Sequence, residues 1–168
     1  MPSRSAPRLV IIHQSRGGQT QRLVEAVCDG ATDPAIAPDI EVTTQDALDG
    51  GPEDVFTADA VLLATPEHFG YMSGAMKHFL ESIYHPCLEL TIGKPWALLV
   101  NAGTDGTGAV SSVERIVTGL RWKKVHPPLV IVAHNDDWTA PTAATSQSLE
   151  AAKDLGRYLA AGLDAGLW

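Results

Sequence analysis

The fold of this chain is decided by an apolar run that leads into a glycine-rich turn, LVIIHQSRGGQT, at residues 9–20. The apolar residues 9–12 predict a buried strand. The turn behind them opens a helix over residues 19–29, whose residues Leu23, Val24 and Val27 share one face. A strand that passes through such a turn into a helix is typical of an α/β domain.

The same alternation continues along the rest of the chain. Further strands are expected over residues 40–44, 60–64, 95–100 and 129–133. Further helices are expected over residues 75–84, 109–120 and 145–163, whereas residues 46–57 fit either a short helix or a loop. Unbroken Val, Ile and Leu runs are typical of parallel strands that helices cover on both faces. We therefore predict one α/β domain over residues 1–168, with residues 1–7 as a flexible tail, built on a doubly wound five-stranded parallel sheet of order 2-1-3-4-5.

Composition excludes several classes of protein. The net charge of −8 opposes general binding to nucleic acid, whose phosphates are negative. No stretch approaches the roughly 18 apolar residues that a membrane span requires, so we expect a cytoplasmic protein. Cys28 and Cys87 have neither metal-binding nor redox spacing, and the histidines are not spaced as metal ligands, so no metal site is predicted.

Ligands of doubly wound sheets bind beyond the carboxyl ends of the strands, so three loops become candidate binding segments. The first loop combines glycines, hydroxyl groups and a helix N-terminus, which together can cradle a phosphate. It has neither the dinucleotide pattern G-x-G-x-x-G nor the lysine of an NTPase loop. A plain capped turn would also fit it. The residues of this first segment are Ser15, Arg16, Gly17, Gly18, Gln19 and Thr20.

The second and third loops have the composition of ring-binding segments. The second loop carries Phe69 and Tyr71, which can pack against a flat heterocycle, although two core aromatics would also fit. The third is rich in glycine and threonine, which permits close approach of the backbone to a ligand. The second segment comprises Thr65, Pro66, Glu67, His68, Phe69 and Gly70, and the third comprises Asn101, Ala102, Gly103, Thr104, Asp105 and Gly106.

These segments resemble the flavodoxin-like FMN proteins, in particular their NAD(P)H:quinone oxidoreductase branch. The family's first loop has roughly the pattern S-x-x-G-x-T, which Ser15, Gly18 and Thr20 match. Its second loop has roughly the pattern T-P-x-x-F-G-x-M-S-G-x-M-K, which residues 65–77 match at each specified position. The third loop matches more loosely, and the resemblance extends from residue 9 to about residue 163.

The resemblance implies a bound FMN, with its phosphate on the first segment, and NAD(P)H as a reductant. It implies an oxidoreductase that reduces quinones or a similar small acceptor. A flavodoxin-type carrier that docks on a redox protein is the alternative, and a domain that has lost its flavin is a third hypothesis. The chain is shorter than typical quinone-reducing members and lacks their insertions, which leaves both a homo-oligomer and the substrate pocket open.

A few residues near the predicted site have two interpretations each. Arg16 either neutralises the FMN phosphate or is simply solvated. His68 is the one catalytic candidate, as a donor of a proton or hydrogen bond to reduced flavin, and a solvated histidine is the alternative. After the last strand, a group of polar and aromatic residues could rim the pocket: His134, Asp136, Asp137 and Trp138.

Overall fold

The computed structural model describes residues 6–132 and 145–168. Its strands are β1 (Arg8–His13), β2 (Glu41–Asp46), β3 (Ala60–His68), β4 (Tyr71–Met72), β5 (Pro95–Ala102), β6 (Lys123–Lys124) and β7 (Leu129–Val132). Its helices are α1 (Gln19–Ala31), α2 (Pro52–Thr57), α3 (Gly74–Cys87), α4 (Thr107–Gly119) and α5 (Ser146–Asp164). The strands and helices alternate as the sequence predicts.

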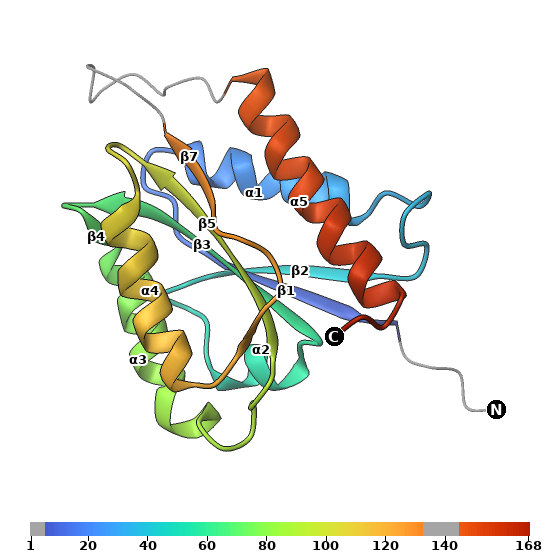
Figure 1. Cartoon of the computed structure of the whole chain (residues 1–168), viewed down its shortest axis with the longest axis horizontal. Coiled ribbons are helices and arrows are strands. Elements are labelled where there is room, and N and C mark those ends of the chain that lie inside the picture. The colour runs from blue at the N-terminus through green and yellow to red at the C-terminus, as the bar shows by residue number, and fades with distance from the viewer. Residues whose placement is uncertain (1–5, 133–144) are drawn as a thin grey trace.

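The strands form one twisted sheet whose long strands are all parallel (Figure 1). β1 lies between β2 and β3, β3 pairs with β5, and β5 pairs with both β6 and β7. The predicted doubly wound α/β class is confirmed. The order along the sheet, β2-β1-β3-β5-β6, differs in detail from the predicted one because the two-residue strands β4 and β6 were not foreseen.

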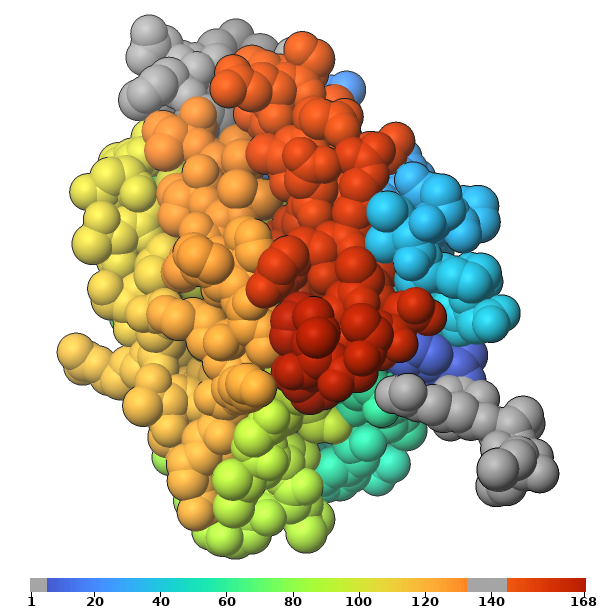
Figure 2. Space-filling view, turned by 45° about the vertical axis from the view of Figure 1, so that its right-hand side comes forward, coloured from blue at the N-terminus to red at the C-terminus, as the bar shows by residue number. Residues whose placement is uncertain are grey.

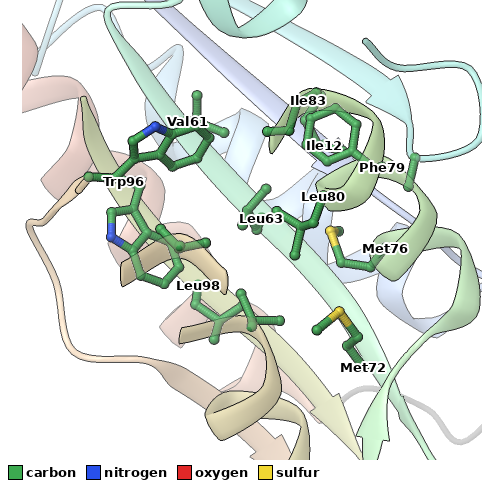
Figure 3. Close-up of a cluster of buried hydrophobic side chains, with 14 of the residues drawn as sticks. Ile12, Val61, Leu63, Met72, Met76, Phe79, Leu80, Ile83, Trp96 and Leu98 are labelled. Carbon is green, nitrogen blue, oxygen red and sulfur yellow. The ribbon is translucent and has the colours of Figure 1, made fainter. Parts of the chain in front are cut away.

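Helices cover both faces of this sheet (Figure 1). On one face, α2, α3 and α4 pack over a core that includes Met76, Phe79 and Leu80 from α3 and Trp96 and Leu98 from β5 (Figure 3). On the other face, α1 and α5 bury the opposite side chains of the same strands. Alternate residues of β1, β3 and β5 therefore serve two separate cores, as expected for a sheet with two covered faces.

Helix α5 forms a broad part of one side of the molecule, between the orange β6–β7 region and the light-blue end of α1 (Figure 2). Its residues Ala152, Leu155, Leu159 and Leu163 are all buried. These four residues form the core face of α5, because the hydrophobic effect drives them against the sheet and α1. No helix in the described ranges is long and apolar enough to cross a membrane.

Several element boundaries differ from the predicted ones by a few residues. β3 continues to His68 and β5 to Ala102, so the first part of each expected loop is strand. α3 continues to Cys87, although Pro86 lies within it. The segment left open between residues 46 and 57 contains a short helix, α2, with proline at its first position, where the missing N–H costs nothing.

Candidate cofactor site

The three predicted segments meet at one edge of the sheet. In the parallel registers, His13 of β1 lies beside Ala64 of β3, and Pro66 of β3 lies beside Asn101 of β5. The chain therefore leaves β1, β3 and β5 at the same carboxyl edge, where α1 and α4 also begin (Figure 1). This edge is where ligands bind in doubly wound sheets.

The first segment places two glycines at the start of α1. Gly18 is the N-cap in the left-handed conformation, with φ of 85°, and as a glycine it has no side chain with which to cap the helix. A Cβ on Gly17 or Gly18 would meet nothing within 4 Å. The Gln21 N–H donates to Ser15 Oγ at 3.2 Å, which folds the loop back over the first turn. Among the described residues, nothing lies within 4 Å of the bare side of either glycine at the positive end of the α1 dipole, and that arrangement suits an anion.

The second segment is a hairpin rather than a loop. His68 pairs with Tyr71 across a two-residue turn at Phe69 and Gly70, whose φ values are 53° and 66°. Positive φ at both central positions defines a type I′ turn, which matches the twist of the flanking strands. Phe69 is fully exposed at the tip, and Tyr71 is exposed beside it. Neither aromatic belongs to the core, so the core interpretation of these two side chains is wrong.

Buried hydroxyl groups fix the base of this hairpin. The Ser73 N–H donates to Thr65 Oγ1 at 3.1 Å, and Ser73 Oγ in turn accepts the Met76 N–H of α3 at 3.2 Å. The Met72 N–H donates to Ser112 Oγ of α4 at 3.2 Å. Thr65, Ser73 and Ser112 are each at least 93% shielded from solvent, so these bonds lie in a dry environment where they are strong.

Helix α4 and the hairpin tip approach each other unusually closely. A Cβ on Gly108 would lie 1.8 Å from the Gly70 carbonyl oxygen. Only a residue without a Cβ permits that distance, so Gly108 lets the hairpin lie directly on the first turn of α4. The position of the hairpin therefore depends on a glycine that the sequence analysis did not single out.

Glu67 joins the hairpin to the third segment. Its Oε2 accepts both the Thr104 N–H at 2.9 Å and the Thr104 hydroxyl at 2.7 Å. In the same segment, Asp105 Oδ1 accepts the Thr107 N–H at 2.9 Å, and this bond lowers the pKa of the Asp105 carboxyl. An ionised carboxylate at the start of α4 also interacts favourably with the helix dipole.

His68 and Arg16 bring the first segment and the hairpin into electrostatic contact. Partial burial lowers the pKa of His68 below 6.5, and the positive charge of Arg16 lowers it further. His13, at the end of β1, also has a pKa below 6.5 because burial outweighs the opposing charge of Asp46. Both imidazoles are therefore neutral at pH 7 and able to donate or accept a hydrogen bond.

The donor and acceptor pattern of the edge fits a flavin nucleotide. Three buried polar atoms here have no hydrogen-bond partner among the described residues: His13 Nδ1, Gln14 Oε1 and Glu67 Oε1. Buried acceptors of this kind are costly unless a ligand or water satisfies them. The open glycine turn suits a phosphate, and the orphaned atoms suit a polar heterocycle or sugar chain. In the described ranges, no group of three ligating side chains could hold a metal ion.

The structure brings the three predicted segments together, and their contacts with a cofactor stay a prediction. His13, Gln14 and Gly108 lie at the same edge but were not among the predicted site residues. The signal for the first two was their place directly after the first apolar run, where a parallel strand ends. His134, Asp136, Asp137 and Trp138 lie outside the described residues.

The fold is that of a flavodoxin-like α/β protein, and the candidate site lies at the carboxyl edge of its sheet. The chain belongs to the NADPH-dependent FMN reductase family, whose model matches residues 10–137. It is similar to a protein named NAD(P)H dehydrogenase (quinone) from Syntrophus aciditrophicus, with 26% identity over 150 residues, 74% of this chain and 70% of that protein. A second protein of that name, from Acidithiobacillus ferrooxidans, is also 26% identical, over 67% of this chain and 66% of its own length.

Solved structures agree with this assignment at the level of the fold. An archaeal flavodoxin superposes with a TM-score of 0.73 at 16% identity, covering 93% of this chain and 98% of its own. A flavodoxin from Streptococcus pneumoniae TIGR4 superposes with a TM-score of 0.71 at 19% identity, covering 96% of this chain and 99% of its own. The predicted resemblance to the flavodoxin-like family is confirmed.

Proposed function

We propose that this chain is an FMN-dependent NAD(P)H oxidoreductase that reduces quinones or a similar small acceptor. Membership of the NADPH-dependent FMN reductase family supports this proposal, as do the names of the curated relatives. The observation that carries it is the pairing of a glycine-lined α1 N-terminus with an exposed hairpin at the same sheet edge. A cytoplasmic location, where reduced nicotinamide nucleotides are available, is part of the same proposal.

Each segment has a separate role in this proposal. The first segment, Ser15–Thr20, binds the FMN phosphate through main-chain N–H groups and hydroxyls, and Arg16 adds a neutralising charge. The hairpin and the third segment would hold the ring system. When bound, FMN supplies the hydride and electron chemistry, which no side chain can perform.

His68 would handle the proton that accompanies reduction. Its imidazole is neutral at pH 7, so it can donate a hydrogen bond from one nitrogen and accept one at the other. Alternation along β3 places His68 on the opposite face from Glu67, toward Arg16. A neutral imidazole there can donate its own N–H or accept a hydrogen bond without placing a second positive charge beside Arg16.

A carrier function is the second candidate, and the net charge of −8 favours it. An acidic protein docks on a basic redox partner through long-range attraction. The exposed Phe69 favours the enzyme instead, because an open hairpin tip leaves access for a planar substrate. A flavodoxin-type carrier would depend on a reductase protein for its electrons, whereas the proposed enzyme accepts hydride directly from NAD(P)H.

One experiment separates these functions. Purified protein is loaded with FMN, made anaerobic and mixed in a stopped-flow instrument with NADH or with NADPH, and the flavin absorbance is followed. We expect rapid bleaching by at least one nucleotide, then reoxidation when a benzoquinone is added. Bleaching only by a ferredoxin-type reductase would establish the carrier, and failure to take up FMN would refute both.

A further inference from the structure

The Glu67 carboxylate is held in a fixed position from two directions. In the hairpin, Glu67 pairs with Met72, whose N–H is bound to Ser112 of α4. From the third segment, Thr104 donates both its N–H and its hydroxyl to Oε2, at 2.9 and 2.7 Å. Two donors on one oxygen fix the orientation of the whole carboxylate, so the position of Oε1 is fixed as well.

That second oxygen has no hydrogen-bond partner. Oε1 is buried, and no hydrogen bond to it occurs in the described part of the chain. No lysine, arginine or histidine in that part forms an ion pair with Glu67 either. A carboxylate oxygen accepts about two hydrogen bonds, and leaving a buried one unsatisfied destabilises the fold. Such an atom at a ligand-binding edge is an acceptor for which the described residues supply no donor, so it is available to a bound ligand.

We propose that Glu67 is a positioning residue whose Oε1 accepts a hydrogen bond from bound FMN and whose negative charge lowers the reduction potential of the flavin. This inference rests on the proposed function. A hydride adds one negative charge to the flavin until a proton follows, and a fixed carboxylate without a counter-ion opposes that charge. Glu67 thereby favours onward electron transfer to the acceptor. Its hydrogen bonds to Thr104 also fix the position of the hairpin relative to the third segment.

The test compares Glu67→Gln with the parent protein and with Glu25→Gln, a control at an exposed position on α1. The glutamine carbonyl can still accept both Thr104 donors, but an NH2 group replaces the free acceptor and the charge is lost. We expect FMN to bind roughly tenfold more weakly, as loss of one charge-assisted hydrogen bond implies. The midpoint potential of the flavin should rise, and the melting temperature of the apoprotein should not fall.

The outcomes are distinct. If Glu67→Gln binds FMN as the parent does, or if its midpoint potential is unchanged, the inference is refuted. Loss of apoprotein stability in Glu67→Gln would show a structural role only and would also refute it. Glu25→Gln should match the parent in affinity and potential. A parent protein that binds no FMN refutes the proposed function itself, an outcome recognisable before any variant is compared.

Discussion

Replacing Gly108 with alanine tests the contact between helix α4 and the hairpin. The new Cβ would lie 1.8 Å from the Gly70 oxygen, whereas an ordinary close contact between carbon and oxygen is about 3.3 Å. The hairpin tip must therefore move by about 1.5 Å, and crowding of this kind costs about 1–3 kcal/mol. Alanine regains up to about 1 kcal/mol of helix propensity, so we expect a net loss of up to about 2 kcal/mol in the free energy of unfolding.

The same displacement should weaken cofactor binding, because the hairpin carries the second predicted segment. Urea unfolding of the apoprotein measures the loss of stability. Quenching of FMN fluorescence measures the affinity for FMN, which we expect to fall tenfold or more. Gly74→Ala is the matched control for stability, since Gly74 also begins a helix and a Cβ there would meet nothing within 4 Å. If Gly108→Ala keeps both parental stability and parental FMN affinity, the close approach does not position the hairpin.

Three further predictions follow from the described contacts. Ser112→Ala should lower the free energy of unfolding, measured with urea, by about 1–2 kcal/mol, because the buried N–H of Met72 in β4 loses its acceptor. Ser111→Ala, at an exposed position, should match the parent. Thr20→Ala should weaken FMN binding in a fluorescence titration without lowering the apoprotein melting temperature by more than a few degrees, and an unchanged dissociation constant would place the phosphate elsewhere. The apoprotein should lose stability as the pH falls below 6.5, because the fold lowers the pKa values of His13 and His68 and the unfolded chain then binds more protons. The urea midpoint measured against pH reports this loss. A double variant with glutamine at both positions should show a flatter profile.

The extent of each strand was harder to predict than its existence. The apolar runs of β1, β3 and β5 identify buried strands, because a strand covered on both faces has little room for polar residues. The continuation of β3 through Thr65–His68 has no such signal, since it contains a proline and two charged or titratable residues. Pairing with β5 on one side and β4 on the other overrides that local composition.

The site was predictable as three loops but not as a connected structure. Glycines and hydroxyl groups identify the three segments, because the backbone conformation of a tight turn restricts which residues can occupy it. The bond from Thr104 to Glu67 joins residues 37 positions apart, and the contact of Gly108 with Gly70 depends on how α4 packs. A positive φ at Phe69 is also invisible in the sequence, because most L-residues avoid that region and the hairpin twist imposes it here.

The division of the sheet into two cores has a thermodynamic consequence for a ligand at its edge. The first segment opens α1, which packs on one face, whereas the hairpin is bonded to α3 and α4 on the other face. A single nucleotide that contacts both would cross-link two layers whose buried side chains form separate cores on the two faces of the sheet. Binding at a hundredfold excess over the dissociation constant adds about 2.7 kcal/mol to the folded state. Amide protons in α1 and in α4 should then slow their exchange together on loading, so cofactor supply would govern the lifetime of the whole protein as well as its activity.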